Sequence, residues 1–364
     1  MKIQQVIDFL EEKAPRVYQE SYDNCGLLTG TASDELTGIL VCLDALEVVV
    51  DEAIEKHCNL VVAHHPIIFS GLKRLSGNSY VERVIRKAIK NDIAIYTIHT
   101  NLDNQLGGVN AELASRLGLI NCRVLQPKLG LLAKLITYCP MEQADQVRSA
   151  LFETGAGKIG EYDLCSFNSE GTGTYRGSEL SNPTLGEKGV LHHEPETKIE
   201  VVFPLFIQER LIKALILAHP YEEVAYDVVA LKNSHRQIGS GLIGELQHSF
   251  TAMEFLAYLK RTMETEVIRY TPFERDIKTV AICGGSGSFL LPDAIRQNAD
   301  AFVTADFKYH QFFDADDQLM ICDIGHYESE KFTIDLIGRW LSEKFPTFAV
   351  VFTKIVTNPV KYYS

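Results

Sequence analysis

The sequence predicts an α/β protein with a two-lobed core of mixed, largely parallel sheets, interrupted by a small ferredoxin-like α+β insertion. In both outer thirds of the 364-residue chain, short apolar runs alternate with helical segments, which is the pattern of βαβ units. The middle carries a β-α-β…β-α-β pattern instead, with a polar, glycine-rich stretch. We therefore expect residues 1–127 to form the first half of the core, 128–238 the inserted domain and 239–364 the second half.

The first third supplies the clearest alternation of helix and strand. Its apolar spacing predicts helices over Ile3–Leu10, Glu47–His57, Val81–Lys90 and Val109–Leu117. Apolar runs predict strands over Gly38–Leu43, Leu60–Ala63 and Ile93–Ile98, with a loop over Tyr22–Gly30.

The last third repeats this order, and the middle differs from it. Strands are expected over Thr279–Cys283, Ala301–Thr304, Leu319–Cys322 and Phe348–Phe352, with helical segments over Leu290–Asn298 and His326–Phe345. In the middle we expect strands over Lys134–Tyr138, Ile199–Phe203 and Val224–Ala230, helices over Ala144–Glu153 and Ile207–Ala218, and a long loop over Asn168–Gly189.

Composition bounds the class of protein. Hydrophobic residues make up 46% of the chain and charged residues 23%, as in ordinary globular proteins. The net charge of −13 argues against a broad phosphate-binding surface, so nucleic acid is not an expected partner. No apolar run approaches a membrane span and the start lacks a signal-peptide pattern, so we expect a cytoplasmic protein without membrane contact. The eight cysteines are scattered without a Cys-x-x-Cys pair, which favours buried, reduced thiols.

Three predicted strand ends carry metal-binding side chains. His64 and His65 close the first apolar run, His99 and Asp103 follow the second, and His326 with Glu330 follows a third near the end of the chain. In open α/β sheets ligands bind at the carboxyl edge of the strands. Imidazole and carboxylate groups are ligands of zinc, iron and manganese, so the sequence predicts a metal site.

Adjacent histidines favour two ions over one. His64 and His65 at a strand end can reach different ions, and Glu330 or Asp103 is a suitable bridging carboxylate. Two ions about 3.5–4 Å apart can activate a water molecule and clamp a phosphate or carbonyl oxygen. Each pair taken alone also has a structural explanation, since Asp103 could cap a helix and His326 with Glu330 could be a surface pair.

Weaker signals leave alternatives open. The glycines of Gly284–Gly287 suit either phosphate contact or a tight turn, without the spacing of a nucleotide-binding loop. Asp306 and His310 are candidates for substrate-facing or supporting groups, or for a solvated helix start. His192 and His193 are expected to be exposed in a polar loop.

Motifs from separate segments resemble the Nif-three-like family, the GTP cyclohydrolase I type 2 homologues. The resemblance rests on Ala63-His-His-Pro66, His99-Thr-Asn-Leu-Asp103 and Gly325-His-Tyr-Glu-Ser-Glu330, supported by Asp23-Asn-Cys-Gly-Leu27, Cys283-Gly-Gly-Ser-Gly287 and Thr304-Ala-Asp306. Within the insertion, Ala218-His-Pro-Tyr-Glu-Glu-Val-Ala-Tyr-Asp227 looks like the PII/CutA-like domain of longer bacterial members.

This resemblance implies a site and an assembly. It implies two divalent metal ions per subunit, zinc, iron or manganese, with the ligands His64, His65, Asp103, His326 and Glu330. His99 stands in the motif without being a direct ligand, so orientation of a ligand or proton transfer is its implied role. The resemblance also implies a toroidal homohexamer whose metal sites face an interior cavity.

Three function hypotheses follow. The first is a metal-dependent hydrolase of the GTP cyclohydrolase type, in which metal-activated water acts on GTP or a related nucleotide or phosphorylated compound. The second is a non-enzymatic metal-binding regulator or chaperone. The third, single-stranded nucleic-acid binding in the ring cavity, is disfavoured by the acidic charge.

Overall fold

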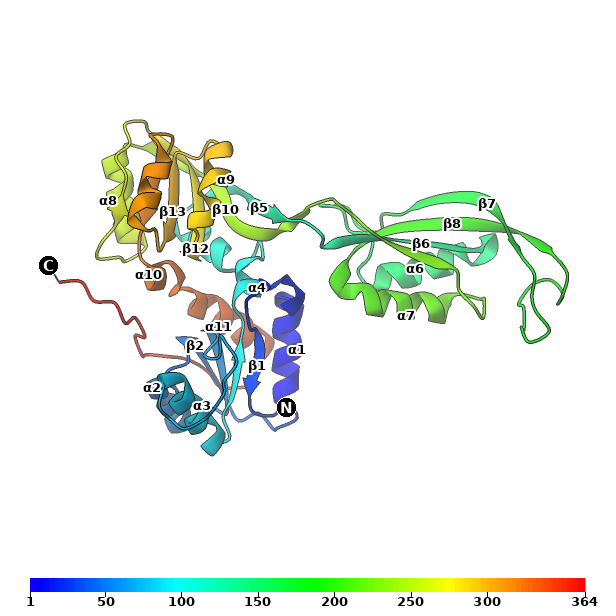
Figure 1. The fold of residues 1–364 in the computed structure, drawn as a ribbon, viewed down its shortest axis with the longest axis horizontal. Coiled ribbons are helices and arrows are strands. Elements are labelled where there is room, and N and C mark those ends of the chain that lie inside the picture. Colours follow the sequence, from blue (N-terminus) through cyan, green and yellow to red (C-terminus); the bar gives the residue numbers. More distant parts are fainter. Residues whose placement is uncertain (364) are drawn as a thin grey trace. The chain divides into compact units, whose positions relative to one another are not determined.

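A computed structural model describes residues 1–363 and separates them into two compact units (Figure 1). The first unit combines Met1–Pro127 with the chain from Gln237 onward, and the second unit is Lys128–Arg236. The first unit holds two mixed, partly parallel sheets and the second a smaller sheet, which confirms the predicted fold class. Among residues 1–363, no helix is both long and apolar enough to cross a membrane.

One sheet of the first unit has the order β1-β4-β3-β2-β15, parallel except for its β1 edge. Its strands are β1 (Gly26–Thr29), β2 (Ile39–Asp44), β3 (Leu60–His65), β4 (Ala94–Thr97) and β15 (Val350–Phe352). Successive residues of β3 enter different cores: Leu60 and Val62 pack on one side, and Val61 and Ala63 on the other. Because both faces are covered, the central strands are continuously apolar.

The other sheet of this unit has the order β11-β14-β13-β12-β10-β5. Its strands are β5 (Ile120–Lys128), β10 (His235–Phe250), β11 (Arg269–Tyr270), β12 (Ile277–Ser286), β13 (Ala301–Ala305) and β14 (Met320–Asp323). Strands β12, β13 and β14 are parallel, whereas β10 runs antiparallel to β12. The sequence patterns did not predict β5, β10 or β11.

Helices cover both sheets of the first unit. They are α1 (Ile3–Lys13), α2 (Glu47–Glu55), α3 (Tyr80–Lys90), α4 (Thr100–Asp103), α5 (Val109–Arg116), α8 (Ala252–Thr262), α9 (Leu291–Arg296), α10 (His326–Glu330) and α11 (Thr333–Lys344). One continuous apolar cluster contains residues of α1, α5, α8 and α11 together with β3 and β12. The two halves of the interrupted chain therefore share a core.

Three predicted segments differ in the structure. The expected loop Tyr22–Gly30 contains the edge strand β1, which pairs with β4. The expected continuous segment His326–Phe345 is broken into α10 and α11. Glu330, which ends α10, is buried in the polar cluster described below, and Phe332, which precedes α11, is buried in the apolar core. The expected loop Asn168–Gly189 begins inside strand β7 (Phe167–Tyr175), whose backbone pairs with β8 along its whole length.

The second unit is a four-stranded antiparallel sheet with two helices. Its elements are β6 (Leu132–Pro140), α6 (Ala144–Glu153), β7 (Phe167–Tyr175), β8 (His192–Pro204), α7 (Gln208–Ala218) and β9 (Tyr226–Ala230). The strand order β7-β8-β6-β9 with antiparallel neighbours is the ferredoxin-like arrangement that the sequence predicted. Leu135, Val201, Val147 and Leu211 fill the core between the sheet and its helices.

Candidate metal centre

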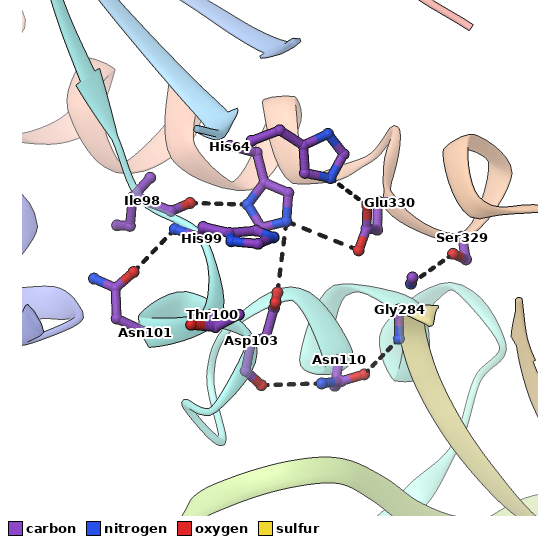
Figure 2. Close-up of polar contacts among 12 residues, drawn as sticks. His64, Ile98, His99, Thr100, Asn101, Asp103, Asn110, Gly284, Ser329 and Glu330 are labelled. Carbon is purple, nitrogen blue, oxygen red and sulfur yellow. Dashed lines mark hydrogen bonds and ion pairs between the residues drawn. The ribbon is translucent and has the colours of Figure 1, made fainter. Parts of the chain in front are cut away.

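Side chains from separate strand ends converge in the first unit. His64 and His65 end β3, His99 follows β4, Asp103 lies in α4, and His326 and Glu330 lie in α10. Parallel pairing places the ends of β3 and β4 side by side, since Ala63 pairs with Thr97. Figure 2 shows His64, His99, Asp103 and Glu330 facing a common space.

His64 is held as a neutral ligand-type imidazole. It is completely buried, and its Nδ1–H donates to the carbonyl oxygen of Ile98 at 2.8 Å (Figure 2). This bond fixes the tautomer, so the Nε2 lone pair points toward Asp103 Oδ1 at 3.5 Å and Glu330 Oε1 at 3.9 Å. Burial lowers the pKa of His64 to about 3, which keeps the ring uncharged at neutral pH.

His65 and His326 flank the other oxygen of Glu330. His65 Nε2 lies 2.8 Å and His326 Nε2 3.0 Å from Glu330 Oε2. Although burial opposes the shift, Glu330 and an outer carboxylate raise the pKa of His65 to about 10 and that of His326 to about 9. The same imidazoles overcome the burial of Glu330 and hold its pKa well below the usual range.

Outer carboxylates orient three of the imidazoles through Nδ1. His65 donates to Asp44 Oδ1 at 2.8 Å, His326 to Asp306 Oδ2 at 2.6 Å and His99 to Asp23 Oδ1 at 2.8 Å. Such bonds leave each Nε2 facing the common space and make it a better ligand.

The outer carboxylates are themselves anchored. The Thr357 hydroxyl donates to Asp44 Oδ2, and the pKa of Asp44 is lowered, against its burial, mainly by His65. Asp23 accepts the Thr100 N–H at 3.0 Å and the Thr100 hydroxyl. Its pKa is also lowered against burial, because His99 and Thr100 bond to its ionised form.

Glu330 belongs to two separate groups of potential ligands. Its Oε1 side faces His64 and Asp103, and its Oε2 side faces His65 and His326, so each trio has its ligand atoms within 4.8 Å of one another. A third trio also has its potential ligand atoms within 4.8 Å of one another: His64, His65 and His99. These residues form one cluster, and Glu330 is the group best placed to be shared.

The glycines at the end of β12 make room for this carboxylate. Gly285 has φ +62°, and a Cβ there would lie 2.3 Å from Glu330 Oε1. Its N–H donates to Ser329 Oγ at 2.9 Å, and the N–H of Gly284 donates to Asn110 Oδ1 at 3.0 Å (Figure 2). Asn110 in turn donates to the Asp103 carbonyl oxygen at 3.0 Å. Gly284 and Gly285 therefore belong to the end of β12 that packs against the cluster, and the chain leaves the strand only at Gly287, which precedes a short 3-10 helix, Ser288–Leu290.

The donor set fits divalent metal ions. Among the residues described, 1–363, His64 Nε2 and Asp103 Oδ1 are buried yet have no hydrogen-bond partner. An unpaired buried polar group is costly, and a cation between these two atoms would satisfy both. Burial, together with the nearby Glu330 carboxylate, also raises the pKa of Asp103 to about 7, against the opposing effect of His99.

The structure thus brings together all five predicted ligands, His64, His65, Asp103, His326 and Glu330, and places His99 beside them. Asp306 supports His326, whereas His310 contacts only Tyr309 and Phe313 among the described rings. His193 is exposed as expected, but His192 is half-buried at the start of β8 and bonds Glu194.

Sequence reasoning missed two supporting residues. Asp44 ends β2 directly opposite His65 in the parallel register, a signal that aligning the ends of neighbouring strands would have found. Thr357 lies in the irregular C-terminal segment and carries no local signal.

An α/β core with a buried imidazole–carboxylate cluster able to hold metal ions defines the class of this protein. The family described as Duf34/NIF3 (NGG1p interacting factor 3) matches residues 1–359, and the chain belongs to this family, as its motifs predicted.

Curated relatives and solved structures agree with this assignment. Proteins named GTP cyclohydrolase 1 type 2 homolog are 40% identical in Bacillus subtilis, over 93% of this chain and 91% of that one, and 41% identical in Halalkalibacterium halodurans, over 99% and 98%. A crystal structure of a Bacillus cereus protein related to NIF3 superposes with a TM-score of 0.86 and 36% identity, covering 100% of this chain and 99% of that one. Staphylococcus aureus SA1388 superposes with a TM-score of 0.79 and 32% identity over the same shares.

Proposed function

We propose that this protein is a metal-dependent hydrolase that holds two divalent ions and acts on GTP or a related nucleotide or phosphorylated compound. The observation that most directly supports a metal site is that two buried atoms, His64 Nε2 and Asp103 Oδ1, have no hydrogen-bond partner among the described residues. The name shared by the relatives supports the substrate class.

The geometry of Glu330 supports two ions over one. Its two oxygens face different trios, His64 with Asp103 and His65 with His326, and no other residue belongs to both. A carboxylate shared in this way is the usual bridge of a two-ion site. Zinc, iron and manganese all accept this donor set.

When bound, such ions supply Lewis-acid polarisation of a substrate oxygen and lower the pKa of a water molecule. The chain's own residues preorganise the site. Ile98 locks the His64 tautomer, Asp44 orients His65, and Asp306 orients His326, so little reorganisation is needed when the ligands are engaged.

His99 is the group best placed to move a proton. Asp23 holds its Nδ1–H, and the His99 ring lies 5.3 Å from the His64 ring and 5.5 Å from the His65 ring, centroid to centroid. We propose that His99 Nε2 accepts a proton during hydrolysis and returns it to the leaving group, with Asp23 stabilising the charged ring.

The experiment measures bound metal and turnover in the same preparation. Elemental analysis should give two equivalents of zinc, iron or manganese per chain, and metal-loaded protein should release formate from GTP. Asp103→Asn should lower both metal content and turnover, whereas the control His310→Gln, outside the cluster, should change neither. Full metal content without turnover on a panel of nucleotides and phosphoesters would refute the hydrolase and favour a non-enzymatic metal-binding regulator. Absence of metal would refute the site itself.

We also propose that the chain assembles into a toroidal homohexamer with the metal sites facing an interior cavity. The family membership supports this assembly. Light scattering coupled to size exclusion should give the mass of six 40.8-kDa chains. A monomer or dimer at micromolar concentration would contradict the proposal.

A further inference from the structure

The inserted unit contains a large cavity that has no part in the metal centre. Its volume is about 840 Å³, its floor is the sheet face opposite the helices, and residues 176–184 and 221–225 supply further lining. The cavity lies wholly within Lys128–Arg236. It is large enough for a small organic ligand.

Glycines in β7 create this space. The antiparallel register places Gly171 opposite Glu196 and Gly173 opposite Glu194, so the glycines share the open face of the sheet with these glutamates. A Cβ at Gly171 would meet nothing within 4 Å, whereas one at Gly173 would lie 2.0 Å from Glu196 Oε2. The glycine-rich sequence therefore leaves room for the Glu196 carboxylate and for a ligand above it.

Glu196 is a buried carboxylate without a cation. It is only 9% exposed, and its Oε1 accepts a hydrogen bond from the Tyr221 hydroxyl at 2.9 Å. Within residues 1–363, it forms no ion pair with a Lys, Arg or His nitrogen. A buried charge is costly unless it is paired, so a positively charged group from outside the chain would complete this site.

Aromatic rings surround this carboxylate. Tyr138, Tyr175 and Tyr221 line the cavity, and the rings of Tyr175 and Tyr221 are 6.1 Å apart. His219 fixes Tyr221: its Nε2–H donates to the Tyr138 carbonyl oxygen at 2.9 Å, and its Nδ1 accepts the Tyr221 N–H at 3.1 Å. Aromatic faces around a carboxylate favour organic ammonium groups, which gain cation–π attraction.

The charge of the lining points the same way. Four carboxylates line the cavity, Glu170, Glu196, Glu222 and Glu223, against two cationic side chains, Arg176 and Lys198. Lys198 is already paired with Glu200, which is not part of the lining. The uncompensated charge is negative, which disfavours a nucleotide or another anion.

We propose that this cavity binds a small aliphatic polyamine, with one protonated amine against Glu196 and its neighbouring methylenes between Tyr138, Tyr175 and Tyr221. The size of the cavity and the second pair of carboxylates, Glu222 and Glu223, suit a ligand with more than one amine. The proposal is independent of the metal centre and of the hydrolase activity.

Titration calorimetry on the full-length protein tests this site. Spermidine and putrescine should bind saturably with one equivalent per chain, and 1,4-butanediol, which has the putrescine carbon chain without its charge, should not bind. Glu196→Gln should weaken spermidine binding at least tenfold. Glu209→Gln removes a carboxylate from α7, away from the cavity lining, and should leave binding within twofold of wild type.

A second variant fills the cavity without removing a charge. Gly171→Leu adds a side chain where the structure has open space, so it should abolish spermidine binding while the melting temperature stays near that of wild type. The proposal is overturned if neither amine binds wild-type protein saturably, if butanediol binds as well as putrescine, or if Glu196→Gln binds spermidine as wild type does. If both variants fail to fold, the comparison of amine with diol on wild-type protein decides the matter.

Discussion

Gly285→Ala should damage the metal centre without removing a ligand. Gly285 has φ +62°, a region that costs an L-residue roughly 1–2 kcal/mol. The added Cβ would also lie 2.3 Å from Glu330 Oε1 and 3.3 Å from His326 Cε1, so the carboxylate must move. Because Glu330 belongs to both trios, its displacement should weaken the binding of each of the two proposed ions. Mutating a residue that positions a metal ligand typically lowers metal affinity about 10–100-fold. We expect a loss of about that size for each proposed ion.

Competition with a chromogenic chelator measures this loss on the intact protein. Gly107→Ala is the matched control, because a Cβ at Gly107 meets nothing within 4 Å and its φ is not positive. Circular dichroism should show both variants folded. If Gly285→Ala binds both ions with wild-type affinity, Glu330 is not a shared ligand and the assignment of the site is wrong.

The remaining predictions concern the groups around the ligands. Thr357→Val removes the hydroxyl that anchors the carboxylate behind His65 and should weaken metal binding up to about tenfold in the chelator assay, whereas Thr353→Val should not; equal affinities would contradict this role. His99→Gln should keep both ions but lower kcat by about 10²–10⁴, and loss of metal instead would make His99 a ligand. The pKa values of His65 and His326 are raised to about 10 and about 9, so both imidazoles are protonated below pH 9. A metal ion that binds there must displace these protons, and metal affinity should therefore rise with pH between about 6.5 and about 8.5. Calorimetry in buffers of different ionisation enthalpy should show proton release on metal binding, and pH-independent affinity would count against these imidazoles as ligands.

The sequence predicted the members of the imidazole–carboxylate cluster more fully than the groups that orient them. His64, His65 and Asp103 follow strand ends, and parallel strands bring such ends to one edge, so local pattern sufficed. Asp44 and Thr357 lie 313 positions apart in the chain, and they contact each other only in the folded protein. Asp44 also reaches His65 only because β2 pairs with β3. No local sequence pattern predicts these contacts.

The fold shows the same division. Continuously apolar strands such as β3 and β13 were predicted, because burial on both faces leaves an unmistakable run. Strand β7 was missed because all of its residues are at least partly exposed, and because Asn168, Gly171 and Gly173 are residue types depleted in strands. Backbone pairing with β8 decides its conformation instead. Its glycines are explained by the space that they leave for the Glu196 carboxylate and for the cavity that it lines, rather than by a loop.

Anomalous diffraction from crystals of the metal-loaded protein tests the central claim most directly. Data collected on both sides of the metal absorption edge should show two peaks per chain, one within ligand distance of His64 Nε2 and Asp103 Oδ1, the other beside His65 Nε2 and His326 Nε2, with Glu330 contacting both. No peak between these side chains, or a single peak that leaves His64 Nε2 and Asp103 Oδ1 unpaired, would contradict the two-ion site.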